Sequence, residues 1–338
     1  MVEKIGIAPL EMSASEAIGL VRQAEAGGFE SAWTSGSHGY LRLAAFAQHT
    51  ERITLGTAVV VQPLFNPVAH ADMLSDLAEL AGGRAIAGIG AGVRPQLNRF
   101  YGIVGDQAEH PAPRIREFLE VLRELMGGER GIDWDGRFFR LQGARGYQPA
   151  NPVPVYLAAV NKLSLRVAGD LADGLIGHPI NSVQYLRETV IPTISERLEA
   201  GGRSRDAFSF SSDVVTSITE DRAVARRDAA ITLGFYLSPK AFNCIFDAGG
   251  WEDEKTQVRD AFRSGEMENV ADAVTDRMLE SCCLVGTPAD VRDQAERYDG
   301  LLDRLIFYAP RHSVPLDRHM QNYQNIFQTF ARTPSAAG

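Results

Sequence analysis

The sequence is short of cysteine and has no excess of positive charge. Its three cysteines, Cys244, Cys282 and Cys283, form no Cys-x-x-Cys pair and no Cys/His spacing typical of a metal site. They therefore predict neither a disulfide framework nor bound metal. Lys and Arg number 34 against 43 Asp and Glu, a net charge of -9. Nucleic acids and anionic membranes are bound through clustered positive charge, so neither is an expected partner.

Long hydrophobic runs and targeting signals are also missing. No stretch reaches the roughly 18 apolar residues that a membrane-spanning helix needs. The first residues, MVEKIGIAPLEMS, lack the charged and then apolar regions of a signal peptide. Hydrophobic residues nevertheless make up 45% of the chain, enough for a large core. These features predict a cytoplasmic globular protein with no membrane partner.

Short apolar strands alternate with amphipathic helices along almost the whole chain, which predicts a parallel sheet. Eight strands, each with a helix after it, predict a TIM (β/α)8 barrel, α/β in class, as a single domain over residues 1–332. A disordered tail is expected at 333–338. The predicted strands cover residues 4–10, 30–35, 53–61, 85–92, 153–160, 174–179, 208–219 and 301–310.

Two segments do not fit a plain barrel. Residues 134–149, WDGRFFRLQGARGYQP, are too irregular for another strand–helix unit and predict a hairpin-like excursion. The region of about 220–300, between strands seven and eight, is helical in character throughout. It predicts a helical insertion over one mouth of the barrel.

The C-terminal ends of barrel strands carry the active site in this fold, so the residues at those ends indicate the chemistry. Here they are mostly glycine, alanine and valine, with no paired carboxylates and no cluster of metal ligands. A hydrolase or aldolase would need a base, a nucleophile or a Lewis acid at these positions. The mouth instead suits a flat cofactor that supplies the reactive atom. The candidate cofactor-binding residues are Ser35, Gly36, Ala58, Val59, Val60, Gly90, Ala91, Gly92, Ala159, Val160, Asn161 and Lys162.

Two motifs among these candidates have alternative interpretations. The stretch GIGAG at 88–92 is followed at once by Arg94 and Pro95, so we expect no helix to open there and no dinucleotide site. Gly90 and Gly92 then either let a ligand approach the backbone or form a tight turn. Asn161 opens a predicted helix, where it is either an N-cap or part of a phosphate site at the helix start.

Three histidines, His38, His178 and His312, stand at predicted strand C-termini. His38 and His178 are the candidate catalytic residues, with an incidental position in a polar loop as the alternative. The other histidines, His49, His70, His110 and His319, are expected in helices or exposed loops.

Segments along essentially the whole chain resemble the bacterial luciferase-like family. LGTAVVVQPLFNPVAHADMLSDLAELAGGRAIAGIGAG resembles the family's central signature, in which a strand ending LGTxV leads through a helix to SGGR and a strand ending GxGxG. AWTSGSH, RIREFLEVLREL, VPVYLAAV and LVGTPADVRDQAERYDGLLDRLIFY also have counterparts there. The resemblance implies a TIM-barrel oxidoreductase that binds reduced FMN or the deazaflavin coenzyme F420, and TERITLGTAVV is more similar to the F420-dependent branch.

In that branch the third strand ends in a non-prolyl cis peptide that backs the cofactor ring. By position the resemblance places this bond between Ala58 and Val59, where the strand stops before Gln62 and Pro63. Many relatives carry Asp-His directly after strand two, with the histidine catalytic. This chain has Gly36-Ser37 there and His38 one place later, so its route of proton transfer is open.

Three functions follow from this reasoning. The first is an F420-dependent oxidoreductase that moves a hydride between the deazaflavin C5 and a small organic substrate. The second is an FMNH2-dependent monooxygenase whose flavin comes from a separate reductase partner. The third is a cofactor-free binding protein on the same scaffold. The aromatic segment from Phe235 to Trp251 either caps an apolar substrate pocket or lies in a homo-oligomer interface, a dimer above all.

Overall fold

The computed structural model describes residues 2–128 and 130–332. These residues form two compact units. The first unit consists of the chain up to Ala32, of Gly177–Pro192 and of the part from Ser209 onward. The second unit consists of Trp33–Ile176 and Thr193–Phe208. The prediction of a single domain is not tested by this division and stays a prediction, and the predicted tail at 333–338 lies outside the described residues.

Parallel strands follow one another in the order β11-β10-β12-β1-β2-β3-β5-β8-β9, and β9 also pairs with β10. The fold is thus the predicted (β/α)8 barrel. Its strands are β1 (Lys4–Ile7), β2 (Ser31–Thr34), β3 (Thr54–Thr57), β5 (Ala85–Gly90), β8 (Val155–Ala158), β9 (Gly174–Gly177), β10 (Ser209–Ile218) and β12 (Arg304–Tyr308). The predicted third strand is interrupted: β3 stops at Thr57 and a short β4 (Val60–Val61) continues beside β5.

In the second unit, local sequence signals mark the start of α3. Asn66 caps α3, its side-chain oxygen accepting from the Ala69 amide at 2.8 Å, and Pro67 holds the first helical position. One helix was not expected: α4 begins at Arg94, soon after the glycine-rich turn, so the reasoning that no helix opens there was wrong. Pro95 is tolerated because the amide it lacks would have no partner in a first turn. The helices are α2 (Gly39–Ala47), α3 (Pro67–Ala81), α4 (Arg94–Tyr101), α5 (Pro111–Met126) and α6 (Lys162–Leu171), and α8 (Ile191–Ala200) lies mostly in this unit.

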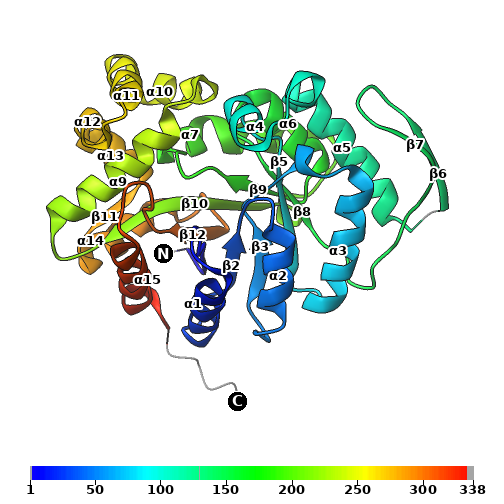
Figure 1. The fold of residues 1–338 in the computed structure, drawn as a ribbon, viewed down its shortest axis with the longest axis horizontal. Coiled ribbons are helices and arrows are strands. Elements are labelled where there is room, and N and C mark those ends of the chain that lie inside the picture. Colours follow the sequence, from blue (N-terminus) through cyan, green and yellow to red (C-terminus); the bar gives the residue numbers. More distant parts are fainter. Residues whose placement is uncertain (1, 129, 333–338) are drawn as a thin grey trace. The chain divides into compact units, whose positions relative to one another are not determined.

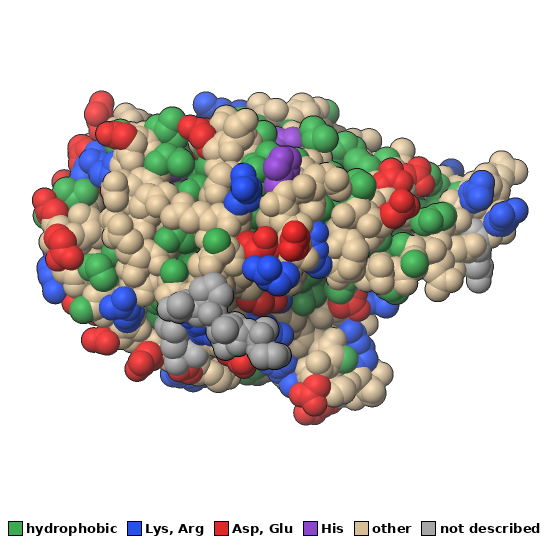
Figure 2. Space-filling view, turned by 90° about the horizontal axis from the view of Figure 1, so that it is seen from below, with side chains coloured by type: hydrophobic (Ala, Val, Ile, Leu, Met, Phe, Trp, Pro, Cys, Tyr) green, Lys and Arg blue, Asp and Glu red, His purple; other side chains and the backbone are tan. Residues whose placement is uncertain are grey.

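The predicted hairpin excursion is confirmed as β6 (Arg130–Asp135) paired antiparallel with β7 (Arg140–Arg145). Figure 1 shows it extending outward from α5, and Figure 2 shows basic side chains at its outer end. Glu117 of α5 holds its turn: the carboxylate accepts from the backbone amides of Phe138 and Phe139 at 3.0 and 2.9 Å. Trp134 Nε1 donates to the same carboxylate at 3.3 Å.

The first unit holds the predicted helical insertion. Figure 1 shows its helices α9 to α13 grouped together after β10. The prediction that this region is helical throughout was wrong at β11 (Leu284–Gly286), where Thr216 pairs with Leu284 because β10 extends past its pairing with β12. The helices are α1 (Ala14–Ala26), α7 (Val183–Tyr185), α9 (Arg222–Leu237), α10 (Asn243–Gly249), α11 (Glu252–Ser264), α12 (Met267–Ala273), α13 (Asp276–Cys282), α14 (Pro288–Ala295) and α15 (Leu316–Phe330).

Candidate active site

The break between β3 and β4 contains a cis peptide bond joining Ala58 to Val59. This confirms the bond that the family resemblance placed there. Backbone hydrogen bonds from β2 and the loop after it hold both sides of the break. The Ala58 amide donates to the Thr34 carbonyl at 2.7 Å, and the Gly36 amide donates to the Val59 carbonyl at 3.1 Å. The structure therefore brings Gly36, Ala58 and Val59 together.

The glycines after β5 let the chain pass close to this break. Gly90 pairs with Val61 on one side and with Ala158 on the other. A Cβ atom at Gly90 would lie 2.8 Å from the Val59 Cγ2 atom, too close for any real contact. The sequence left open whether Gly90 serves close approach or a turn, and at this position close approach of Val59 requires the glycine.

The strand ends of the second unit present a row of small, partly exposed residues. None has a side chain larger than valine, so a flat ring could pack against their backbone; this fits a tricyclic cofactor. The partly exposed residues are Ser35, Gly36, Ala58, Val59, Ala91, Gly92 and Ala158. We call these seven residues the small-residue row.

Several of the candidate cofactor-binding residues do not belong to the small-residue row. The side chain of Val60 is fully buried, and a Cβ atom at Gly39 of α2 would lie 2.7 Å from its Cγ2 atom. Ala159 and Val160 are also buried, and Gly90 lies beneath Val59. Ala158, which stands at the end of the predicted fifth strand but was not among the candidate cofactor-binding residues, is the partly exposed alanine of β8. Its pairing with Gly90 is the register signal that would have identified it.

The candidate phosphate site lies at the start of α6. Asn161 occupies the N-cap position, and its carbonyl accepts from the Leu165 amide at 2.9 Å. Its side chain, however, makes no capping bond to the helix, so the simple N-cap interpretation accounts only for its backbone. Asn161 and Lys162 are both exposed. A helix start with an exposed lysine is a favourable place for an anion.

His38 is an exposed residue at the start of α2, in the second unit. Its ring lies beside Gly36: a Cβ atom there would be 3.7 Å from the His38 Cε1 atom. Partial desolvation, and then the charge of Arg42, lower the pKa of His38. A neutral imidazole next to the small-residue row can accept or donate a proton, as the candidate catalytic role requires.

His178 belongs to the first unit, at the end of β9, where aromatic rings enclose it. Its ring centre lies 5.1 Å from that of Tyr236 and 4.8 Å from that of Phe242. Its Nδ1 atom is buried and has no hydrogen-bond partner among residues 2–128 and 130–332. Burial lowers the pKa of His178 to about 3, so the ring is neutral at pH 7.

His312 resembles His178 in its surroundings. It stacks on Phe235 with ring centres 3.7 Å apart and meets Tyr236 edge-on at 5.3 Å. Burial, and then the charge of Arg311, lower its pKa to about 3. His178 and His312 thus contact the same tyrosine, which the sequence reasoning had not singled out.

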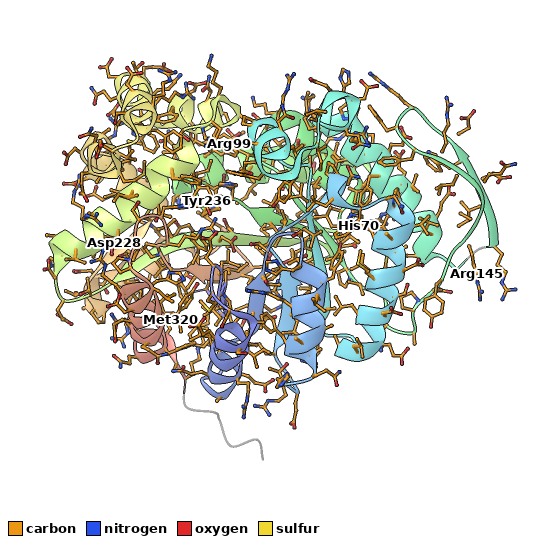
Figure 3. The ribbon with its side chains drawn as sticks, viewed as in Figure 1. His70, Arg99, Arg145, Asp228, Tyr236 and Met320 are labelled. Atoms are coloured by element: carbon orange, nitrogen blue, oxygen red, sulfur yellow. The ribbon has the colours of Figure 1, made fainter. Side chains whose placement is uncertain are left out.

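His70 was expected in a helix or an exposed loop, and the helical position is confirmed. It is fully buried on α3, where Figure 3 labels it. Its Nδ1 lies 2.9 Å from the Tyr40 hydroxyl and its Nε2 3.2 Å from the Gln62 carbonyl. A carbonyl only accepts, so Nε2 carries the proton and Nδ1 accepts from Tyr40. This chain of bonds ties α2 to the turn after β4, the two segments that flank the cis peptide.

His319 was likewise expected in a helix or an exposed loop; it lies on the helix α15, where it is buried. Its ring nitrogens bond the carbonyls of Pro310 and Leu10 at 2.8 and 3.1 Å. This histidine has a structural explanation and is no candidate for catalysis.

Within residues 2–128 and 130–332, no group of three or more His, Cys, Asp or Glu residues is arranged to hold a metal ion. No helix in the same residues is long and apolar enough to cross a membrane.

Known proteins with similar sequences or structures include F420-dependent oxidoreductases. Residues 3–304 match the family described as luciferase-like monooxygenase. The 5,10-methylenetetrahydromethanopterin reductase of Archaeoglobus fulgidus is 31% identical, over 80% of this chain and 82% of its own. The F420-dependent glucose-6-phosphate dehydrogenase of Mycolicibacterium fortuitum is 28% identical, over 88% of each chain. The structure of a coenzyme F420-dependent tetrahydromethanopterin reductase from Methanopyrus kandleri superposes with a TM-score of 0.81 at 22% identity, covering 97% of this chain and 99% of that one.

Proposed function

The chain belongs to the luciferase-like monooxygenase family and is an oxidoreductase, and on this premise we propose that its cofactor is coenzyme F420. The proposed reaction moves a hydride between the deazaflavin C5 and a small organic substrate. The observation that carries the proposal is the small-residue row, against which a flat ring can pack. The relative named as an F420-dependent dehydrogenase supports it.

The residues of the second unit fit this cofactor by size and by charge. Hydrogen bonds from the Ala58 amide to the Thr34 carbonyl and from the Gly36 amide to the Val59 carbonyl hold this segment in place. The glycine at position 90 lets Val59 lie close to the adjacent strand end. The first-turn amides of α6, with Asn161 and Lys162, would take the phosphate-bearing tail. When bound, the cofactor supplies the hydride; a 5-carba ring reacts poorly with oxygen, so reduction or dehydrogenation is expected rather than oxygen insertion.

Fluorescence titration of the full chain with F420, and separately with FMN, tests this proposal. We expect F420 to bind in the micromolar range and FMN to bind more weakly. A Lys162→Ala variant should weaken F420 binding, because it removes a positive charge beside the proposed phosphate position, and an exposed lysine elsewhere, Lys4→Ala, is the control. Tight binding of FMN with no binding of F420 rules the proposal out.

A second candidate function is an FMNH2-dependent monooxygenase supplied by a separate reductase. The description of the matched family as luciferase-like monooxygenase favours it. It predicts that the chain binds reduced FMN and consumes oxygen when a reductase and substrate are present. The third possibility, a cofactor-free binding protein, predicts that neither cofactor binds. We propose a homodimer in each case, which light scattering of the purified chain tests.

A further inference from the structure

The second unit contains a pocket of about 250 Å³ at the N-terminal ends of its strands. Its walls come from the second half of α5, from the segment 148–153, from Val155 at the start of β8 and from Asp173, which precedes β9. Apolar side chains predominate in these walls and include Leu119, Leu122, Met126, Pro149, Val153 and Val155. Such a pocket suits a small, mainly apolar molecule.

This pocket is separate from the proposed cofactor seat. The strand β8 runs from Val155, which lines the pocket, to Ala158, which belongs to the small-residue row. At roughly 3.3 Å for each residue, these two positions lie about 10 Å apart. In a (β/α)8 barrel the catalytic residues come from the C-terminal strand ends, and the N-terminal ends form the opposite face. No residue of the small-residue row lines the pocket, so a second kind of ligand is needed to fill it.

The volume of the pocket sets the size of that ligand. An apolar cavity of about 150 Å³ binds benzene, and drug-sized ligands occupy about 300–1,000 Å³. A pocket of about 250 Å³ therefore fits a molecule of about ten non-hydrogen atoms. The apolar walls favour a hydrocarbon body, because binding removes the apolar surface of both from water.

Arg123 brings hydrogen-bond donors to the wall of the pocket. Its Nη2 atom donates to the Leu171 carbonyl, and to Asp173 Oδ1 at 3.2 Å. A guanidinium has five N–H groups, and both of these bonds start from Nη2. Within residues 2–128 and 130–332, no acceptor lies within hydrogen-bond distance of its Nε or Nη1 atom. Since the side chain is 48% exposed, these N–H groups are open to an acceptor atom of a ligand.

The acidic residue in the walls is already in use. Among the described lining residues, Asp173 is the only acidic one. Its Oδ1 atom accepts from Arg123, and its Oδ2 atom accepts from the Val155 amide at 2.8 Å. Both oxygens of this carboxylate thus have partners inside the fold, and Asp173 is held in place beside the pocket.

A second cation near Arg123 leaves an excess of positive charge. Burial lowers the pKa of Arg203, Asp173 opposes this, and the charge of Arg123 adds to it, so the two guanidinium groups are close. The neighbouring Asp170 is bound by one arginine of α5 and one of α8. This group of residues therefore holds more arginines than aspartates. The carbonyls at the end of α6 offset only about half a charge, so an anion is favoured here.

We propose that this pocket binds a small carboxylate with an apolar body, a ligand of the size and chemistry of octanoate. The hydrocarbon body would lie against the apolar walls, and the carboxylate would accept from the unpaired Nη1 group of Arg123. Hydrogen bonds between a guanidinium and a carboxylate are about twice as strong as those between neutral groups. The inference is independent of the proposed function, and neither of its tests uses F420.

Methyl NMR of the full chain tests the site directly. The seven methionines are labelled with ¹³C at the methyl group, and the Met126 resonance is identified as the one missing in Met126→Leu. At pH 7 we expect octanoate to shift this resonance saturably. Octan-1-ol, which has the same chain and no charge, should bind at least about fivefold more weakly, because it lacks the charge-assisted bond. Octylamine, with the opposite charge, should not shift it.

The control in the same spectra is Met320, identified in the same way, which lies on α15 of the first unit (Figure 3). Its resonance should not move with any of the three probes. The proposal is overturned if octan-1-ol binds as tightly as octanoate, if octanoate causes no saturable shift in the millimolar range, or if Met320 responds like Met126. Because these measurements use the wild-type sites, they decide the matter even where a variant does not fold.

A second experiment tests the role of Arg123 by isothermal titration calorimetry. Arg123→Gln should raise the Kd for octanoate about tenfold and leave the Kd for octan-1-ol unchanged, because only the carboxylate uses the charge. Arg123→Lys keeps the charge and should cause a smaller loss. Arg145→Gln, at an exposed arginine of β7 in the same unit (Figure 3), is the control and should bind both probes as the wild type does. Equal affinities for octanoate in Arg123→Gln and Arg145→Gln, with near-ultraviolet circular dichroism showing both folded, overturn the proposal.

Discussion

At the scale of single residues, the candidate site depends on a glycine, which has no side chain, and on a histidine that carries no charge. Gly90 has no side chain because Val59 occupies the space, and His70 is neutral because burial lowers its pKa to about 4. Neither property could be read from the residue type. The glycine-rich turn was visible in the sequence, but the neighbour that requires it lies on another strand. Two predictions belong to this scale.

Replacing Gly90 by valine should damage both packing and the proposed cofactor seat. The added Cβ would lie 2.8 Å from Val59 Cγ2, so the cis segment must move. We expect a loss of about 1–3 kcal/mol in unfolding free energy and at least tenfold weaker F420 binding. Urea unfolding and fluorescence titration measure the two effects. Gly19→Ala in α1 is the matched control, because its Cβ would meet no atom within 4 Å and alanine favours the helix. Unchanged affinity in Gly90→Val would show that Val59 does not line the cofactor site.

His70 should make stability depend on pH. Its pKa is about 4 in the folded chain against an ordinary value of 6.5, so the unfolded chain binds more protons between these two pH values. The contribution of His70 to the unfolding free energy is therefore fully present above about pH 6.5 and is lost as the pH falls toward 4. The loss is about 1.4 kcal/mol for each unit by which the folded and unfolded pKa values differ. His178 and His312 act in the same direction.

Urea unfolding of His70→Gln at pH 7 and pH 5 checks this. Between pH 7 and pH 5, the unfolding free energy of the variant should fall by less than that of the wild type. At pH 7 the variant should be less stable than the wild type, because the Tyr40 hydroxyl has lost its hydrogen bond to His70. Replacement of the exposed His49 by glutamine should leave the pH dependence as it is. An identical slope in His70→Gln and the wild type contradicts the prediction.

At the scale of elements, helix ends and strand runs were predictable because their signals are local. Ser13 closes a capping box with Glu16 at the start of α1, and Asn66 with Pro67 starts α3; in both cases residues within four positions of one another set the helix start. The helix α4 and the strand β11, which were not predicted, are short elements. The strand β11 exists because β10 is long enough to offer it an edge, and a local pattern carries no information about the length of a distant strand.

The β6–β7 hairpin should become less ordered when the Glu117 carboxylate is removed. A two-stranded hairpin is marginally stable alone, and Glu117 accepts from three donors in its turn region. In Glu117→Ala we expect faster proteolytic cleavage within residues 130–145 and greater solvent exposure of Trp134, seen as a red shift of its fluorescence. The global midpoint of unfolding should change little. Glu124→Ala, an exposed residue of the same helix, is the control, and equal cleavage rates in both variants would contradict the role of Glu117.

At the scale of the whole molecule, the barrel strands depend on long-range pairing. In the first unit, Arg304 of β12 binds Glu30 through two bonds of 2.7 Å and donates to Ser211 of β10 at 3.1 Å. The Arg304 side chain is 5% exposed. Burial acts to raise the pKa of Glu30, but hydrogen bonding and the charge of Arg304 outweigh it and leave the pKa lowered.

Removing this arginine should be costly. Arg304→Leu removes the guanidinium that neutralises the half-buried Glu30 carboxylate, and we expect a loss of about 3–5 kcal/mol in unfolding free energy. The double variant Glu30→Gln/Arg304→Leu should recover part of this loss, because the negative charge that Arg304 neutralised is also removed. For comparison, Arg140→Leu breaks the exposed pair with Asp135 and should cost less than about 1 kcal/mol. Thermal or urea unfolding measures all three variants, and equal losses for Arg304 and Arg140 would contradict the argument.

The eight barrel strands, the luciferase-like family and, through the family resemblance, the position of the cis peptide could be predicted from the amino-acid sequence alone. These depend on residues near one another in the chain, or on a pattern kept along its whole length. Packing in three dimensions was needed to show that Ala158 is partly exposed while Ala159 is buried, and that His70 links Tyr40 to Gln62. It also placed Tyr308 and Arg311 on the oxygen of Tyr236, although 72 and 75 residues separate them from it. Burial and hydrogen bonding are set by which distant segments pack together, and a local pattern does not contain that information.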